Sequence, residues 1–434
     1  MSFRSFLTTS KNVTRSGFVW NTTSSGLFAL QSLIMLIVTQ NVLGKNDAGM
    51  LAIAQAIAFL LGCIGTFGVA RYQASDVKRL YSFADYVAIR VVTIVAMWAA
   101  AAIVLVIRSG AYDATKIGIV TLMVLLKTVD VVGDVFFGHF QRVGRIDVAG
   151  RTTALRTTVS IITFIVALLA CRQLVTSLII TVVLSTVVLV AIAIITLPEF
   201  VPEPERRLDR HALSHLLAAC APMFVAWFLS GYLTNAPRYS IDAVTNESTQ
   251  AIYGFLVSPA FVVSLLAQFL FNPLIYRYSL MWAQGQAKQL RQSVLRMLVS
   301  IVGIGAAVCL LGYFIGLPIL GWVYQTDLQP YRAEFMTLLV AGTTTATSAF
   351  LYTVITIMRK QAVLAVCYLI VSLGALLGGA PLVRQFDLMG ASMLYLGTTL
   401  ILSVCFLIVT LVFLARDTST KEQPDATEQA LLAL

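Results

Sequence analysis

The feature that most constrains this chain is a series of long apolar segments that recurs from one end to the other. Each is about 20 residues long or longer, which is the length that an α-helix needs to cross the hydrocarbon core of a membrane. We place twelve such segments, at residues 17–40, 50–72, 84–107, 117–139, 152–170, 174–197, 214–236, 250–274, 297–317, 334–357, 361–383 and 389–415. The sequence therefore predicts an all-α polytopic membrane protein with twelve transmembrane helices.

Composition supports this fold class and excludes others. Hydrophobic residues make up 59% of the 434 residues, and charged residues only 12%, against about 25% in soluble proteins. A soluble enzyme, a DNA-binding protein and a disordered chain are therefore excluded. The net charge of +10 implies no nucleic-acid partner, because Lys and Arg gather in the cytoplasmic loops of membrane proteins.

The distribution of Lys and Arg predicts the topology. If the N-terminus lies in the cytoplasm, the inner segments hold 20 of the 30 basic residues and the outer loops hold seven, so both termini are expected to be cytoplasmic. In the inner segment 277–296, Lys288, Arg291 and Arg296 alternate with apolar residues. This pattern is typical of a short basic helix on the inner membrane surface.

A segment rich in proline and charge divides the apolar segments into two sets of six, an arrangement found in many secondary transporters. The expected organisation is an N-terminal six-helix lobe at 1–197, a cytoplasmic linker at 198–213, a C-terminal six-helix lobe at 214–415 and a polar cytoplasmic tail at 416–434.

Sequence motifs of enzymes and metal sites are missing. The six cysteines have no paired spacing and no CxxC, and the chain has three histidines, so we expect neither disulfides nor a zinc site. No P-loop, HExxH or GxSxG motif occurs, and the outer loops are too short for a catalytic domain. We therefore expect no enzyme activity and no bound cofactor.

The fourth apolar segment contains three charged residues, Lys127, Asp130 and Asp134. Their i, i+3, i+7 spacing puts them on one helical face, and each costs about 2.5–3.5 kcal/mol at the centre of a membrane. This face must therefore contact protein or water. Two interpretations remain open: a structural Lys127–Asp130 ion pair, or the wall of a polar cavity with Asp134 left unpaired and available for ion coupling. In both, Lys127→Ala is expected to leave Asp130 without a partner.

Three arginines lie near the inner ends of apolar segments in the N-terminal half: Arg71, Arg90 and Arg156. Each can simply extend to the lipid headgroups. Together they can instead form a cationic mouth, because the arginine fork binds phosphate oxygens in bidentate fashion. Lys127 and Arg238 are the next candidates for binding a substrate diphosphate.

Several motifs in the chain are similar to those of a known transporter family. They are LGKNDAGM at 43–50 followed by FGVARYQASD at 67–76, DVFFGHFQR at 134–142 followed by Arg145 and Arg156, and NAPRY at 235–239 followed by YGF at 253–255, Pro259 and Asn272-Pro273. From about Ser16 to Arg416, the chain resembles the polysaccharide transporter family, the Wzx-type O-antigen flippases. This family belongs to the multidrug/oligosaccharidyl-lipid/polysaccharide exporter superfamily. Related lipid II flippases have cavity arginines where the first segment here has Gln31 and Gln40, which disfavours lipid II as the substrate.

The resemblance implies two six-helix lobes around a central cavity and transport by alternating access. It implies that the substrate is an undecaprenyl-diphosphate-linked oligosaccharide, moved to the outer leaflet of a bacterial inner membrane for cell-surface polysaccharide or lipopolysaccharide synthesis. The expected partners are this lipid-linked oligosaccharide, membrane lipids, and a polysaccharide polymerase with other assembly proteins. A proton or sodium gradient acting on Asp130 or Asp134 is a candidate energy source. Two alternatives remain: a multidrug cation antiporter of the same superfamily, and a membrane glycan polymerase or ligase.

Overall fold

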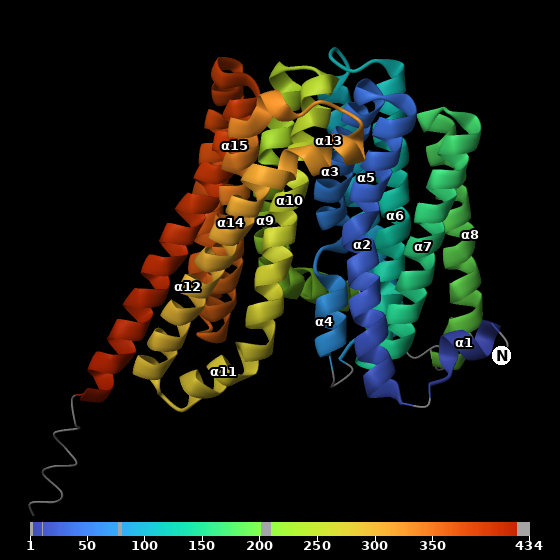
Figure 1. Ribbon diagram of the computed structural model, residues 1–434. Helices are drawn as coiled ribbons and strands as arrows, with labels where there is room; N and C mark the ends of the chain where they lie inside the picture. The colour runs from blue at the N-terminus through green and yellow to red at the C-terminus, as the bar shows by residue number, and fades with distance from the viewer. Residues whose placement is uncertain (1–2, 11, 77–79, 201–209, 423–434) are drawn as a thin grey trace, which may run out of the picture. The chain divides into compact units, whose positions relative to one another are not determined.

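The computed structural model describes residues 3–10, 12–76, 80–200 and 210–422, and these residues form helices and short connections with no β-strand. The helices up to residue 200 are α1 (Phe3–Thr8), α2 (Val13–Leu43), α3 (Lys45–Thr66), α4 (Val69–Ser75), α5 (Phe83–Arg108), α6 (Ala114–Arg142), α7 (Ile146–Cys171) and α8 (Leu174–Phe200) (Figure 1). From residue 210 onward they are α9 (Arg210–Val244), α10 (Glu247–Phe271), η1 (Asn272–Leu274), α11 (Ile275–Ala283), α12 (Ala287–Leu311), the π-helical η2 (Gly312–Gly316), α13 (Leu317–Tyr324), η3 (Gln329–Tyr331), α14 (Arg332–Ile357) and α15 (Gln361–Glu422).

The predicted all-α polytopic fold with twelve transmembrane helices is confirmed. Ten helical stretches among the described residues are long and apolar enough to span a membrane. The charged helix α6 is an eleventh. Asp387 has a non-helical backbone (φ 49°), which divides the long α15 into two spans. These twelve correspond to the apolar segments of the sequence.

The chain forms two compact units. Unit 1 contains Met1–Tyr232 and Asn246–Ile252, and unit 2 contains Leu233–Thr245 and Tyr253–Leu434. The expected linker at 198–213 lies largely outside the described residues, as does the end of the expected tail, although α15 continues to Glu422. The domain bounds given by the sequence therefore stay a prediction.

The second predicted span is interrupted. Phe67 (φ 46°) and Gly68 (φ 71°) both adopt a left-handed backbone, which ends α3 and starts the separate seven-residue helix α4. Hydropathy does not detect this break, because apolar residues continue through it. As a result, Arg71 lies on the short helix α4 and not on the long helix α3.

The predicted surface helix at 277–296 is wrong in its bounds. The structure has a short helix, α11, at Ile275–Ala283, but Lys288, Arg291 and Arg296 belong to the first turns of the long helix α12. The basic residues therefore extend a membrane span instead of forming a helix of their own.

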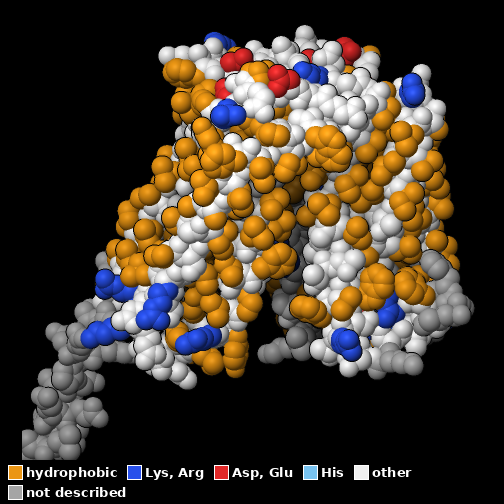
Figure 2. All heavy atoms as spheres, in the orientation of Figure 1, with side chains coloured by type: hydrophobic (Ala, Val, Ile, Leu, Met, Phe, Trp, Pro, Cys, Tyr) orange, Lys and Arg blue, Asp and Glu red, His pale blue; other side chains and the backbone are white. Residues whose placement is uncertain are grey.

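The outer faces of the helices are apolar. In Figure 2, hydrophobic side chains cover the helix sides within each unit, and the coloured Lys and Arg lie near helix ends. On α5 the exposed hydrophobic residues include Val95, Ile103, Val106 and Ile107. An exposed apolar face of this extent suits contact with lipid tails and does not suit water.

Inside unit 1, α2 packs closely along α7. A Cβ atom on Gly150 would lie 2.6 Å from the backbone carbon of Trp20, so only glycine permits this approach. Farther along the same pair of helices, the Gln31 amide donates a hydrogen bond to the Ser160 hydroxyl over 3.0 Å. Small residues and interhelical hydrogen bonds of this kind are how membrane helices associate. Gln31 therefore contributes to helix packing.

The topology can be tested by cysteine labelling at four exposed positions. We expect cysteines that replace Lys45 and Asp327 to react with a membrane-impermeant maleimide from the outside of intact cells. Those that replace Gln284 and Lys360 should react only after the membrane is made permeable. All four residues are exposed, so accessibility depends on the side of the membrane alone. External labelling of Gln284 or Lys360 would contradict the predicted orientation.

Candidate functional site

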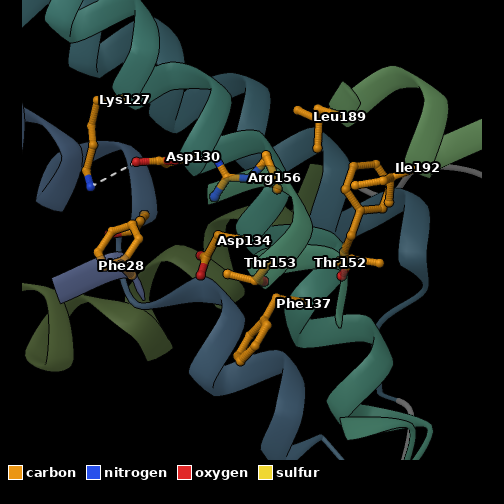
Figure 3. A pocket seen from close by; sticks show the side chains of 13 residues that line it. Phe28, Lys127, Asp130, Asp134, Phe137, Thr152, Thr153, Arg156, Leu189 and Ile192 are labelled. Carbon is orange, nitrogen blue, oxygen red and sulfur yellow. Dashed lines mark hydrogen bonds and ion pairs between the residues drawn. The ribbon is translucent and has the colours of Figure 1, made fainter. Parts of the chain in front are cut away.

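Unit 1 contains a cavity of about 200 Å³ between its helices. The walls come from α2, α3, α6, α7 and α8, and the lining residues are Phe28, Thr66, Lys127, Asp130, Gly133, Asp134, Phe136, Phe137, Thr152, Thr153, Arg156, Leu189 and Ile192. Figure 3 shows the charged side chains of α6 and α7 directed toward one another at this cavity. The polar-cavity interpretation of the fourth segment therefore agrees with the position of all three of its charges.

Asp130 lies between two cations. Its Oδ2 atom accepts a hydrogen bond from the Lys127 ammonium at 3.3 Å, and its Oδ1 atom accepts one from Nη1 of Arg156 on α7. The Lys127–Asp130 ion pair expected from the i, i+3 spacing is present. Arg156 is an additional partner, so the expectation that Lys127→Ala leaves Asp130 unpaired is wrong.

Asp134 is also paired, which corrects the expectation that it has no partner. Arg90 on α5 donates a hydrogen bond from Nη2 to Oδ2 of Asp134 over 2.7 Å, and its Nη1 donates to the Gly65 carbonyl of α3. The sequence indicated no partner because residue spacing relates only residues of the same helix, and Arg90 lies on another helix. The Arg90 side chain is 3% exposed and does not line the cavity, whereas Asp134 is 29% exposed and does.

The Lys127 side chain is positioned by its neighbours as well as by Asp130. Its ammonium lies 4.6 Å from the centre of the Phe28 ring, within range of a cation–π interaction. Its aliphatic stem crosses Gly62 of α3, where an added Cβ atom would lie 2.8 Å from both Cγ and Cε of the lysine. The missing side chain at Gly62 therefore leaves the space that the lysine stem occupies.

The other two candidate phosphate ligands do not line this cavity. Arg71 is exposed on α4, with its guanidinium 4.6 Å from the centre of the Trp227 ring. Arg238 is a half-buried residue of α9 in unit 2, within electrostatic range of Tyr253 and Tyr324. Of the five predicted phosphate ligands, the structure thus places Lys127 and Arg156 at the cavity, and Arg90 behind it.

The charges around the cavity do not cancel. Lys127, Arg90 and Arg156 contribute three positive charges, and Asp130 and Asp134 contribute two negative ones, so the network has a net charge of +1. Because ion pairs in a low-dielectric interior are weakly screened, this excess attracts an anion more strongly than it would at a protein surface. Among the described residues, no group of three or more His, Cys, Asp or Glu could hold a metal ion.

Several site residues had no signal in the sequence. Phe28, Phe136, Phe137, Leu189 and Ile192 line the cavity, but apolar residues in a transmembrane segment look alike whether they face lipid or a cavity. Gly62 and Gly133 are similar cases, because their contribution is the absence of a side chain and appears only once α6 and α7 are placed beside them.

Gly62→Ala tests the packing around Lys127. We expect this variant to lose about 1–3 kcal/mol of stability, because the new methyl group overlaps the lysine stem. Gly118→Ala is the matched control on α6, since nothing lies within 4 Å of a Cβ atom there, and it should unfold no earlier than the wild type. The measurement is thermal unfolding of purified protein in detergent. Equal melting temperatures for both variants would contradict the close packing of the Lys127 stem against Gly62.

Arg90→Met tests whether Arg90 is a structural partner of Asp134 or a free phosphate ligand. Removing the cation leaves a carboxylate and the Gly65 carbonyl without this donor, so we expect a loss of about 3–5 kcal/mol in unfolding free energy. The exposed Arg71→Met should lose about 1 kcal/mol or less. A pure phosphate ligand would instead leave the stability of the ligand-free protein unchanged, and a wild-type melting temperature for Arg90→Met would favour that role.

No protein-family model and no curated protein sequence matches this chain. Solved structures do. One is the inward-facing conformation of a multidrug resistance MATE family transporter of the MOP superfamily, with a TM-score of 0.66, 14% identity, and coverage of 91% of this chain and 96% of the other. The Vibrio cholerae MATE transporter VcmN in the bent form matches with a TM-score of 0.56 and 12% identity over 93% and 98% of the two chains.

A third solved structure is a MOP superfamily transporter from Pyrococcus furiosus, described as having a reverse polarity of its binding pocket that suggests a different function. It matches with a TM-score of 0.58 and 13% identity, covering 98% of this chain and 99% of the other. At these identities the likeness concerns the fold, and these neighbours are transporters and not enzymes. The chain is a multi-pass membrane protein with the fold of the MATE transporters of the MOP superfamily.

Proposed function

We propose that the protein is a flippase that moves undecaprenyl-diphosphate-linked oligosaccharides from the cytoplasmic to the outer leaflet of a bacterial inner membrane. Transport takes place by alternating access, without any change in covalent bonds, and serves the synthesis of cell-surface polysaccharide. The fold of a membrane transporter supports the transport part of this proposal. The substrate is inferred from the chemistry of the cavity in unit 1 and from the motifs of the sequence.

The observation that carries the proposal is the polarity of that cavity. Its charge network has a net charge of +1, and both carboxylates already accept hydrogen bonds from cations. A positively charged drug would have to compete with Arg90, Arg156 and Lys127 for these carboxylates. A phosphate group instead meets a surplus of donors that suit its oxygens.

The size of the cavity supports the same choice. Pockets for drug-sized ligands are typically about 300–1,000 Å³, whereas this cavity has about 200 Å³. A space of this volume suits a compact group such as a phosphate or diphosphate. We therefore propose that unit 1 holds the charged headgroup, while the polyprenyl chain of the substrate stays in the lipid.

The second candidate function, a multidrug cation antiporter, is favoured by a different observation. Phe28, Phe136 and Phe137 line the cavity, and Asp134 is its most exposed charged side chain among the ion-paired residues there. Aromatic rings and a carboxylate can together bind an organic cation. Exchange of such cations for protons or sodium would make this protein a multidrug exporter.

The energy source is part of the proposal. A proton or sodium gradient can act on Asp130 or Asp134, because both carboxylates line the cavity and their interactions change when an ion binds. A polysaccharide polymerase and other assembly proteins are the proposed partners, since they act on the glycan after it reaches the outer leaflet.

Transport by purified protein in liposomes tests the function. We expect a polyprenyl-diphosphate-linked oligosaccharide with a fluorescent sugar to become accessible to a quencher or a sugar-cleaving enzyme on the far side of the vesicle. The length of its sugar chain should stay unchanged. Arg156→Gln should reduce the initial rate about tenfold or more, since it removes a charge-assisted contact, and Arg172→Gln, on an exposed turn, is the control.

The outcomes of this experiment separate the candidate functions. Flipping without growth of the glycan supports the flippase, and covalent elongation indicates a polymerase or ligase. Ion-driven accumulation of ethidium or a similar organic cation, together with no movement of the lipid-linked oligosaccharide, would replace the proposal with the multidrug antiporter.

A further inference from the structure

The Asp130 carboxylate lies between two cations that belong to different helices, Lys127 of α6 and Arg156 of α7. Each carboxylate oxygen accepts a hydrogen bond from one cation, Oδ1 from Arg156 and Oδ2 from Lys127. All three side chains line the same cavity (Figure 3). A phosphate group also has two oxygens on one central atom, and each of them can accept a hydrogen bond from one of the two cations.

Both cations also make packing contacts that do not involve Asp130. The Lys127 stem crosses Gly62 and its ammonium faces the Phe28 ring. The Arg156 guanidinium lies against Gly133, where an added Cβ atom would be 3.6 Å from Nε, and its side chain is 8% exposed. These contacts remain when the carboxylate moves away, so we expect the Lys127 stem to keep its place and Arg156 to stay at the cavity wall if another anion replaces Asp130.

We propose that Asp130 is an internal placeholder for the substrate phosphate: it occupies the anion position between Lys127 and Arg156, and the phosphate of the substrate displaces it from that position on binding. The inference rests on the proposed function, because it specifies which part of the lipid-linked substrate the cavity of unit 1 binds. It adds a mechanism of exchange between an internal and an external anion.

The exchange explains why a transporter would keep a carboxylate at a phosphate site. Two neighbouring cations in a low-dielectric interior repel each other, and burying them without an anion is strongly unfavourable. Asp130 removes this cost between transport cycles. It also competes with the bound phosphate and so weakens binding, which allows release on the other side of the membrane.

Asp134 provides a matched control, because it is a second carboxylate of the same cavity with a different kind of partner. Its cation, Arg90, is almost fully buried, is bonded to the Gly65 carbonyl as well, and does not line the cavity. Asp134→Asn therefore removes a negative charge without freeing a cation at the cavity wall. Asp130→Asn removes the same charge and frees two.

The test is titration of purified protein in detergent with inorganic pyrophosphate, followed by calorimetry. We expect Asp130→Asn to lower the dissociation constant about tenfold or more relative to the wild type, the effect of one competing charged hydrogen bond. Asp134→Asn raises the net charge equally but frees no cation at the cavity wall, so it should lower the dissociation constant by a smaller factor than Asp130→Asn. If Asp130→Asn binds pyrophosphate no more tightly than the wild type or Asp134→Asn, the placeholder role is wrong.

A second measurement covers the case in which Asp130→Asn is unstable. Two freed cations lower the stability of the variant, and an anion that takes the carboxylate's place must restore it. We therefore expect pyrophosphate at about 10 mM to raise the melting temperature of Asp130→Asn more than that of the wild type. An equal or smaller rise would contradict the exchange.

A polyprenyl diphosphate without sugars, added in mixed micelles, distinguishes a lipid-borne phosphate from a free one. Tighter binding of both probes by Asp130→Asn supports the exchange and the proposed function together. Tighter binding of pyrophosphate alone supports the exchange and contradicts the lipid-linked substrate. Failure with both probes, in a protein that still flips the oligosaccharide, overturns the placeholder and leaves the flippase in place.

Discussion

A charge inside a membrane must be paired or hydrated, and in this protein that constraint falls on α6. Its two carboxylates each reach a neighbouring helix: Asp134 contacts Arg90 of α5 and Asp130 contacts Arg156 of α7. The ion pairs therefore connect three helices where the hydrophobic effect supplies no attraction between them. Asp130, Asp134 and Arg156 also line the cavity of unit 1, so the interactions that hold these helices together also determine the chemistry of the site.

The cavity depends equally on residues without side chains. Gly62 and Gly65 lie three residues apart on one face of α3, which packs against α6. The first leaves room for the Lys127 stem, and the second contributes the backbone carbonyl that Arg90 and Thr93 both bind. Bulkier residues on this face would separate the helices and lengthen every contact of the charge network. Close packing and the polar site are therefore parts of one arrangement.

Hydropathy was sufficient to predict the twelve spans, because burial in lipid requires long apolar segments and little else. It was insufficient for local backbone changes such as the break at Phe67, where the residues stay apolar while the backbone becomes left-handed. In the site, the Lys127–Asp130 pair could be predicted from spacing on one helix. The Arg90–Asp134 and Arg156–Asp130 pairs join residues 44 and 26 positions apart, and a single hydropathy profile does not indicate which helices are neighbours.

The distinction between an anionic and a cationic substrate follows from how the carboxylates are used. An organic cation that binds Asp130 must replace Lys127 and Arg156 as its partners. In the described part of the cavity, these two cations have no other carboxylate at hydrogen-bonding distance. They would then stay buried without a negative partner. An anion that binds Lys127 and Arg156 displaces a single carboxylate and leaves both cations paired. Because all five charged side chains stay attached to the protein, a bound anion brings the net charge of +1 toward zero, whereas a bound organic cation raises it further. In a low-dielectric interior this difference supports the phosphate-bearing substrate that we propose, although the fold is that of multidrug transporters.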